Sequence, residues 1–183
     1  MNASSNEVDV RVLLRADHDE TLRLVYDLCA ADSAGERRAV LTLLKPALLA
    51  HSGAEERAVY EPLLDRRIPD DPPLTAAEGL VEHDLVDTLL AELAHSRRAD
   101  GAEWIAAATV MKEVLEAHIE EEHEAMFVAL GQRFSGEELR AMGSRFLATK
   151  QKLLETEASR PQWRPMTSPF APVAVLSPAS GGE

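Results

Sequence analysis

The stretch from Val114 to Phe127 places two polar side chains where a helix that faces a protein core should be apolar. At about 100° per residue, residues spaced three and four apart share one stripe of a helix. This stripe consists of Met111, Val114, Leu115, His118, Glu122, Ala125, Met126 and Ala129. His118 and Glu122 lie side by side in its middle. Burying both groups without partners would cost several kcal/mol, so a chain with this pattern must supply partners for them.

The same helical period covers most of the chain and predicts an all-α protein. Aromatic residues make up only 4% of the sequence, and its runs of Ala, Leu, Glu and Arg are typical of helices. We expect helices over about residues 8–31, 36–67, 75–98, 102–133 and 135–156. Pro46 and Pro62 each remove an internal hydrogen bond, so kinks are expected there. Capping boxes are expected at Thr75 with Glu78 and at Ser135 with Glu138.

The first four helices are long and have short connections, which favours an antiparallel, up-down-up-down four-helix bundle with an additional C-terminal helix. A chain of 183 residues is long enough to bury a core as one domain. We expect a flexible N-terminus over residues 1–7, the helical domain over residues 8–157 and an irregular, Pro-rich tail over residues 158–183. The tail segment that starts at Phe170 is apolar, so whether the tail docks on the bundle stays open.

Each bundle helix carries a histidine on its apolar stripe, and two of the helices add a glutamate four residues later. These residues are His18, His51, Glu55, His83, His118 and Glu122. The first two histidines are equally distant from the turn at residues 34–35, and the last two from the turn at residues 100–101. Glu55 and His83 are placed almost symmetrically about the loop at residues 68–74. In antiparallel helices such residues lie level with each other, so all six side chains are expected to meet at one level of the core.

Imidazoles and carboxylates together are typical ligands of transition metals. Four histidines and two glutamates exceed the three protein ligands of a typical catalytic zinc site. They suit two metal ions bridged by Glu55 and Glu122, and metal binding would offset the cost of burial. The alternative is that each histidine is an ordinary core residue whose ring nitrogens are bonded within the protein. His–Glu pairs four residues apart also occur on solvated helices.

The arrangement resembles the hemerythrin-like HHE cation-binding domains over about residues 10–132. The resemblance rests on the order H…HxxxE…H…HxxxE and on the segments HSGAEERAVYEPL (51–63), EHD (82–84) and HIEEEHEAMF (118–127). It implies an antiparallel four-helix bundle around two non-heme iron ions with a bridging oxo or hydroxo oxygen. The implied ligands form three pairs: His18 and His51 on one iron, His83 and His118 on the other, and Glu55 and Glu122 as bridges. Manganese and zinc accept the same ligands.

Two features depart from the oxygen-carrying members that the chain resembles. Those proteins have H-x-x-x-H on the third helix, whereas here Asp87 takes the second position. They also have a bridging Asp five residues after the last histidine, whereas this chain has Glu122 at four and His123 at five. One iron thus loses a histidine and gains water, an exchangeable position or Asp87 as a weak ligand. A more open site favours reaction with oxygen or peroxide over reversible oxygen carriage.

Other polar residues are assigned to supporting or surface roles. Tyr26 and Tyr60 could reach the centre and act in redox or proton transfer, although packing with a bonded hydroxyl is the simpler expectation. His123 points about 100° away from Glu122, which places it beside the centre or at the surface. We interpret Glu56, Glu120, Glu121 and Glu124 as a solvated acidic face.

The ExxH spacing of ferritin-like di-iron bundles also occurs twice, ending at His95 and at His123. By the same level argument these two histidines lie about three turns apart, so they cannot share a site. His95 is expected at the surface near a helix end.

The formal charge of −13, from 32 acidic and 19 basic residues, argues against nucleic acid or an anionic membrane as partner. The single Cys29 excludes an intramolecular disulfide, and no leader or membrane-spanning run is visible, so we expect a cytoplasmic protein.

Three functions fit these observations. The first is an enzyme that reacts with O₂ or reactive oxygen species, with peroxide disproportionation as the expected activity. The second is a non-catalytic sensor or store of oxygen, nitric oxide or iron. The third is a metal-free helical interaction module. The expected small ligands are O₂, peroxide or NO. A redox partner is not identifiable, and the expected state is a monomer or weak dimer.

Overall fold

The computed structural model describes residues 8–65 and 74–158, and most of them lie in helices. No strand occurs in this part of the chain, so the predicted all-α class is confirmed. The expected N-terminal segment at residues 1–7, most of the expected loop at 68–74 and the tail from residue 159 lie outside the described residues. Within the described ranges, no helix is long and apolar enough to cross a membrane.

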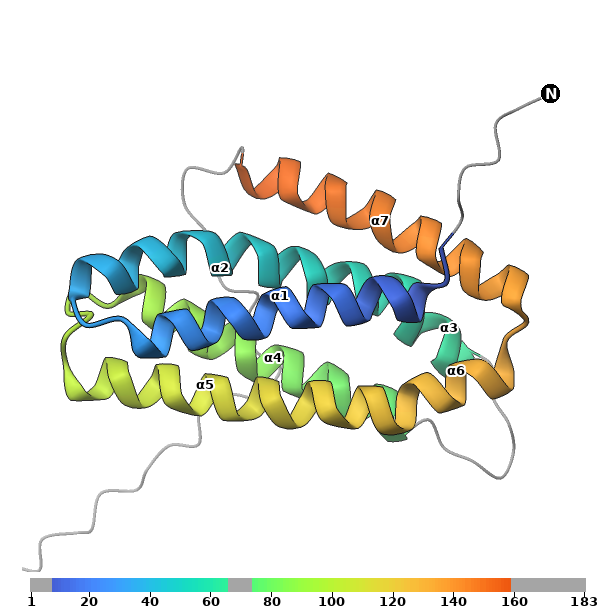
Figure 1. Cartoon of the computed structure of the whole chain (residues 1–183), viewed down its shortest axis with the longest axis horizontal. Helices are drawn as coiled ribbons and strands as arrows, with labels where there is room; N and C mark the ends of the chain where they lie inside the picture. Colours follow the sequence, from blue (N-terminus) through green and yellow to red (C-terminus); the bar gives the residue numbers. More distant parts are fainter. Residues whose placement is uncertain (1–7, 66–73, 159–183) are drawn as a thin grey trace, which may run out of the picture.

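The long helices lie lengthwise beside one another, with one further helix on the outside (Figure 1). The segments are α1 (Val10–Ala30), α2 (Ala34–Glu55), η1 (Glu56–Tyr60), α3 (Glu61–Asp65), α4 (Leu74–His95), α5 (Ala102–Glu121), η2 (Glu122–Met126), α6 (Phe127–Arg133) and α7 (Gly136–Ala158). The two η segments are π-helical. The long helices that lie side by side in Figure 1 are α1, α2, α4 and α5, and the outer helix, α7, lies against α1 and α2.

The helix ends agree with the prediction in part. The predicted capping box is present at Ser135, whose hydroxyl accepts from the backbone of Glu138 at 3.3 Å while the Glu138 carboxylate accepts from the Ser135 backbone at 2.8 Å. α4 already includes Leu74, one residue before the cap predicted at Thr75, and helix boundaries commonly shift by a residue or two. The side chain of Thr75, and with it the predicted box, lies outside the described residues. The helix also ends at His95, before Arg98, because the Ser96 hydroxyl accepts from the Arg98 backbone.

The π-helical segments were not predicted, and both adjoin a core glutamate. Pro46 lies inside α2 without interrupting it. Before Pro62, by contrast, the backbone N–H of Glu61 donates to the carbonyl of Glu56, five residues back. Proline has no N–H and its ring collides with the carbonyl four residues before it, so a wider turn fits there. η2 has no proline, and its sequence gives no comparable signal.

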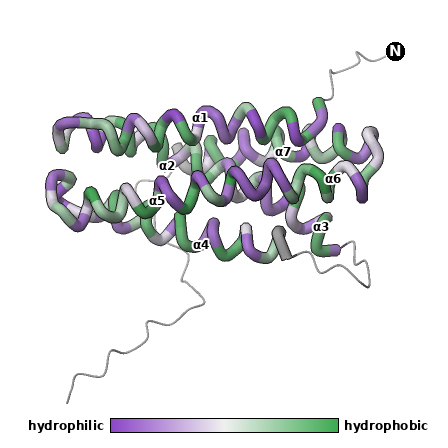
Figure 2. The backbone as a smooth tube through the Cα atoms, turned by 60° about the horizontal axis from the view of Figure 1, so that its bottom comes forward, coloured by the Kyte–Doolittle hydropathy of each residue, from purple (hydrophilic) through white to green (hydrophobic). Residues whose placement is uncertain are grey.

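The apolar core consists of two clusters separated by a polar layer. One cluster includes Val10, Leu14, Tyr60, Leu63, Met126, Leu130 and Phe146. The other includes Leu24, Leu28, Leu44, Leu48, Leu90, Leu93, Trp104 and Met111. On α1, α2, α4 and α5 a buried histidine stands between the residues of the two clusters. Figure 2 shows hydrophobic and hydrophilic residues interspersed along each helix, as expected for helices with one buried face.

Gly143 on α7 allows the chain just before α1 to pass close to this helix. A Cβ at Gly143 would collide with the carbonyl oxygen of Val8 and lie 3.3 Å from the backbone nitrogen of Val10. Replacing glycine by alanine inside a helix usually stabilises a protein by about 0.5–1 kcal/mol. We expect Gly143→Ala to destabilise this protein by about 1–3 kcal/mol, the usual cost of overpacking, in urea unfolding.

Gly35→Ala is the matched control, because its Cβ would face only the Ser33 hydroxyl at 3.9 Å. It should unfold at the same urea concentration as the parent or slightly above. A Gly143→Ala variant as stable as this control would show that the chain before α1 does not hold its observed position.

Candidate metal centre

The polar layer contains the six side chains that the sequence singles out, and all six are buried. They are His18 on α1, His51 and Glu55 on α2, His83 on α4, His118 on α5 and Glu122 at the start of η2. Two groups of three place one ligand atom of each residue within 4.8 Å of the others. One group is His18, His51 and Glu55, and the other is Glu55, His83 and His118. The structure therefore brings together residues from all four long helices.

Each glutamate contacts one histidine from either half of this layer. Glu55 Oε2 lies 3.4 Å from His51 Nε2 and 3.7 Å from His83 Nε2. Glu122 Oε2 lies 3.2 Å from His18 Nε2 and 3.6 Å from His118 Nε2. The rings of the first pair, His18 and His51, are 4.8 Å apart, and those of the second pair, His83 and His118, are 4.9 Å apart. The two carboxylates thus lie between two pairs of imidazoles.

Most atoms that point into this space have no hydrogen-bond partner. Within the described part of the chain they are Nε2 of His18, His83 and His118, both oxygens of Glu55 and Oε2 of Glu122. A buried polar atom left without a partner costs about 1–3 kcal/mol. Nitrogen and oxygen donors in this combination match the ligands of iron, manganese and zinc. The residues therefore fit a metal centre, which would satisfy these atoms.

Three of the four histidines are oriented by carboxylates on their outer side. His51 Nδ1 donates to Asp17 at 2.9 Å, and His83 Nδ1 donates to Glu56 at 3.0 Å. His118 Nδ1 donates to Glu82 at 2.7 Å. An outer carboxylate of this kind fixes the ring, holds the proton on Nδ1 and makes Nε2 a better ligand.

His18 has a different outer partner, because its Nδ1 lies 3.0 Å from Nε2 of His123. Arg15 can only donate, and its guanidinium lies 3.2 Å from Nδ1 of His123. A neutral His123 then holds its proton on Nε2 and donates it to His18. His18 accordingly holds its own proton on Nε2, which faces Glu122. Binding of a metal at His18 requires that proton to move.

Tyr60 and the glutamates form the most strongly perturbed groups of the layer. The buried Tyr60 hydroxyl donates to Glu122 Oε1, and the ring stacks on His83 at 5.4 Å. Burial and the charge of Glu55 raise the pKa of Glu122 to about 8. Burial opposes it, but contacts with His51 lower the pKa of Glu55 to about 2. Burial likewise opposes the protonation of His51, yet Asp17 and Glu55 raise its pKa to about 10. Burial lowers the pKa of His18 and His83, so positive charge in this layer is favoured at His51, beside Asp17 and Glu55.

The remaining predicted residues lie in different places. His123 is half-buried beside His18, as described above. Asp87 is half-buried one turn beyond His83 and belongs to neither group of three. Tyr26 is 47% exposed and donates to Glu116, so the structure does not bring it to the centre. His95 is exposed at the end of α4.

The interpretation of Glu56 as part of a solvated face is wrong, because its carboxylate accepts from His83. Asp17 and Glu82 had not been singled out either. Each of these acids is adjacent in sequence to a core histidine or glutamate: Asp17 precedes His18, Glu56 follows Glu55 and Glu82 precedes His83. That adjacency was the available signal, and each acid serves a histidine of a neighbouring helix.

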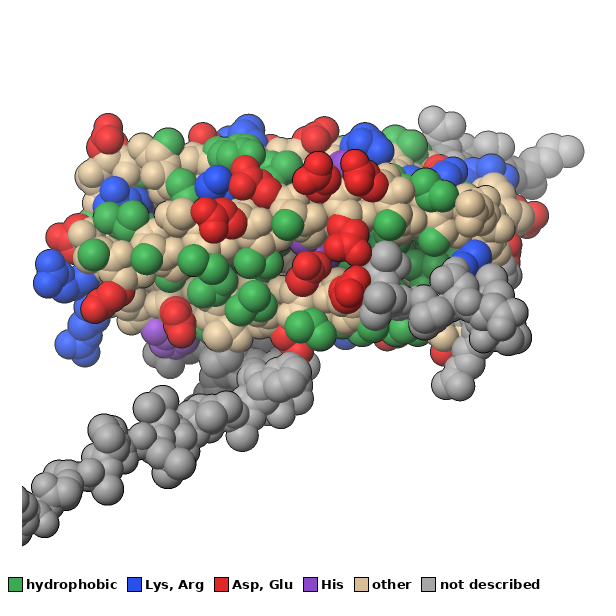
Figure 3. Space-filling view, turned by 90° about the horizontal axis from the view of Figure 1, so that it is seen from below, with side chains coloured by type: hydrophobic (Ala, Val, Ile, Leu, Met, Phe, Trp, Pro, Cys, Tyr) green, Lys and Arg blue, Asp and Glu red, His purple; other side chains and the backbone are tan. Residues whose placement is uncertain are grey.

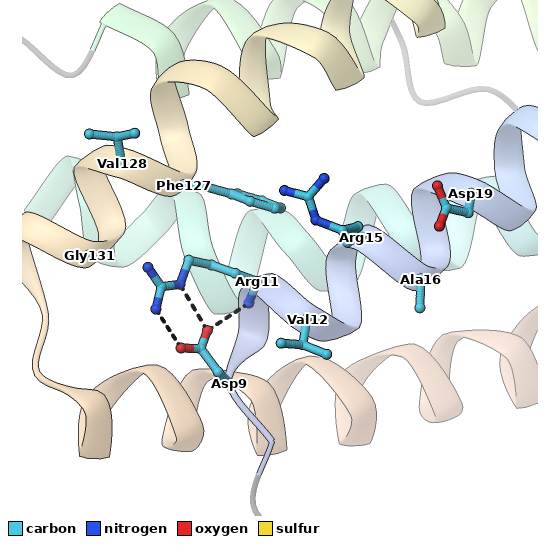
Figure 4. A pocket seen from close by; sticks show the side chains of 9 residues that line it. All are labelled: Asp9, Arg11, Val12, Arg15, Ala16, Asp19, Phe127, Val128 and Gly131. Atoms are coloured by element: carbon cyan, nitrogen blue, oxygen red, sulfur yellow. Dashed lines mark hydrogen bonds and ion pairs between the residues drawn. The ribbon is translucent and has the colours of Figure 1, made fainter.

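The space next to the centre is small. A cavity of about 10 Å³, lined by Gly79, Glu82, His118, Glu121, Glu122 and Met126, is close to the minimum for a single water molecule. A larger hollow of about 610 Å³ lies between α1 and α6, and Figure 4 shows Arg15 and Phe127 at its wall. The Arg15 guanidinium lies 5.3 Å from the centre of the Phe127 ring.

Comparisons with known proteins identify one family. The model of the hemerythrin HHE cation-binding domain matches residues 9–130, which is well over half of the chain. No curated protein and no solved structure gives a match.

The orphaned atoms predict that one ligand can be replaced with a gain in stability when metal is withheld. In chelator-treated protein we expect His18→Leu to raise the free energy of unfolding by about 1–3 kcal/mol. The change removes a buried Nε2 that lies 3.2 Å from Glu122 Oε2 but makes no hydrogen bond. His123, its outer partner, is half-buried and can bond to water instead. Urea unfolding in chelator measures the effect, and the exposed His95→Leu serves as control. A less stable His18→Leu variant in chelator would contradict this explanation.

Proposed function

Because the chain belongs to the hemerythrin HHE cation-binding domain family, we propose that it is a non-heme di-iron protein that reacts with O₂ or reactive oxygen species. The observation that carries the proposal is the set of buried, inward-facing nitrogen and oxygen atoms without hydrogen-bond partners. Donors on α1, α2, α4 and α5 meet at one level, as an up-down-up-down bundle would arrange them.

The pairing of the donors supports two ions. Each of the two groups of potential ligands contains two imidazoles and one carboxylate, and that carboxylate is Glu55 in both groups. Glu122 contacts one histidine of each pair. We assign His18 and His51 to one ion, His83 and His118 to the other, and Glu55 and Glu122 to both.

Bound iron would supply electron exchange with O₂ or peroxide, which protein side chains do not provide themselves. The chain contributes the surroundings of that chemistry. The Tyr60 hydroxyl donates its proton in a hydrogen bond to Glu122. Burial raises the pKa of Tyr60, so this hydroxyl stays protonated and remains a donor. The cavity of about 10 Å³ beside His118 and Glu122 is close to the minimum for one water molecule, so it is too small for an organic substrate. We propose peroxide disproportionation, in which two H₂O₂ yield O₂ and two H₂O, because it needs no separate electron donor.

A non-catalytic sensor is the second candidate, and one observation favours it. Asp17 joins His51 to Lys150 on α7, and the Phe146 ring on α7 lies 6.0 Å from the His51 ring. A change at the centre can therefore reach a helix outside the group that surrounds it. The third candidate, a metal-free interaction module, gives no account of the orphaned donors.

Metal analysis of the purified protein tests the proposed centre. We expect about two metal ions per chain, and fewer in His118→Ala, because that change removes a donor from one position. His95→Ala, whose side chain lies at the end of α4, should keep the full content. Chelation should also lower the melting temperature of the parent, since ligand at about 1,000 times its Kd contributes about 4 kcal/mol. No metal in the parent, with a melting temperature indifferent to chelator, would refute the proposal.

Oxygen release from peroxide separates the enzyme from the sensor. The iron-loaded parent should release O₂ from H₂O₂ continuously at a low protein concentration, and the chelated protein should not. The His95→Ala variant should match the parent. An iron-loaded protein that is inert to peroxide but loses protease resistance on α7 when stripped of metal would favour the sensor instead.

A further inference from the structure

The two halves of the centre have similar inner ligands but different surroundings. We call His18 with His51 the first half-site and His83 with His118 the second half-site. Each pairs two imidazoles with the shared glutamates. The second half-site also has the Tyr60 ring stacked on His83 and Asp87 one turn beyond that histidine. The differences in charge lie in the groups bonded to the outer nitrogens.

The first half-site is backed by two cations. Asp17, which accepts from His51, is also paired with the ammonium group of Lys150 on α7. The side chains of Asp17 and Lys150 are only 19% and 21% exposed, so solvent screens this pair weakly. Behind His18 stands His123, which accepts from Arg15. As derived above, that contact also places a proton on the nitrogen of His18 that would bind metal.

The second half-site is backed by carboxylates alone. Glu56 and Glu82 accept from His83 and His118, and no described cation lies within ion-pair distance of either acid. Glu121 lines the small cavity there together with Glu82 and Glu122, so further acids gather on this side. Figure 3 shows acidic side chains near the middle of the face seen from below, where α5 lies.

Acids on the first side do not cancel this difference. Asp19 is exposed and lines the hollow of Figure 4 near Arg15, but it forms no ion pair with Arg15. Arg15 is exposed as well, so water screens both charges. The more deeply placed pair of Asp17 and Lys150 dominates on this side.

We propose that the two metal positions are inequivalent: the second half-site binds a divalent cation more tightly and fills first, and Lys150 weakens binding at the first. An outer carboxylate strengthens an imidazole ligand by drawing on its Nδ1 proton. A carboxylate shared with an ammonium group does so less. Lys150 is thus a positioning residue that acts through Asp17 and His51, and it lies on α7, beyond the residues matched by the family model. This inference rests on the proposed di-metal centre.

Titration of the chelator-treated full chain with Co²⁺ tests the inference, because the visible spectrum of Co²⁺ reports its ligands. Two adjacent ions repel each other, so even identical half-sites would fill in two steps. Single half-sites are therefore compared: His51→Ala leaves the second, and His83→Ala leaves the first. We expect the Kd of His51→Ala to be about 10-fold lower than that of His83→Ala, in the range of outer-ligand effects on metal affinity.

Lys150→Gln gives the sharper result. Added to His83→Ala, it should tighten Co²⁺ binding about 10-fold, and added to His51→Ala it should change nothing. Lys152→Gln, on an exposed position of the same helix, is the matched control and should have no effect in either background. If the alanine variants do not fold, Lys150→Gln alone should tighten the weaker of the two steps in the parent and leave the tighter step unchanged.

The outcomes separate the inference from the proposed function. Equal affinities in the two alanine variants, or a weaker second half-site, overturn the inference while two bound ions in the parent uphold the di-metal centre. Weaker binding after Lys150→Gln means that Lys150 only holds the structure in place, which overturns its assigned role. A parent chain that binds no Co²⁺ overturns both.

Discussion

The fold depends on a layer of buried polar side chains that crosses an otherwise apolar core. Nδ1 of each of His51, His83 and His118 donates a hydrogen bond to an outer carboxylate, and Nε2 of the same ring faces inwards. The helices must keep a fixed rotation and level for these bonds to form, since each acid stands on a different helix from its histidine. The polar layer thus specifies how the helices align, which apolar contacts alone would leave less defined.

The π-helical segments adapt the backbone to this layer. η1 begins directly after Glu55, and η2 begins at Glu122. A π turn adds a residue to the helical repeat, so the side chains beyond it rotate relative to those before it. Tyr60 ends η1 and reaches Glu122 on the facing helix. A π-helical segment on each glutamate-bearing helix places the two carboxylates and the tyrosine in one layer, while the apolar cluster beyond them stays packed.

The sequence predicts the six inner residues because helical period and equal distances from turns are properties of the chain alone. It identifies the helices and the capping box at Ser135 for the same reason. The outer partners were missed, since the choice of Asp17, Glu56 and Glu82 depends on how neighbouring helices rotate against each other. The role of Lys150 depends on where α7 packs, which the sequence alone does not determine. η2 was not predicted, because its sequence contains no proline.

The division of the core into two apolar clusters has a consequence for how the protein opens. Each cluster draws on several helices, and in the core the polar layer lies between the two clusters. The layer aligns the helices through its outer hydrogen bonds, but its inward-facing donors have no partners. We therefore expect the backbone amides of the two ends to be protected from exchange to different degrees. An ion bound in the layer would merge the two clusters into a single cooperative unit. A bound metal would then control the strength of that coupling in addition to overall stability.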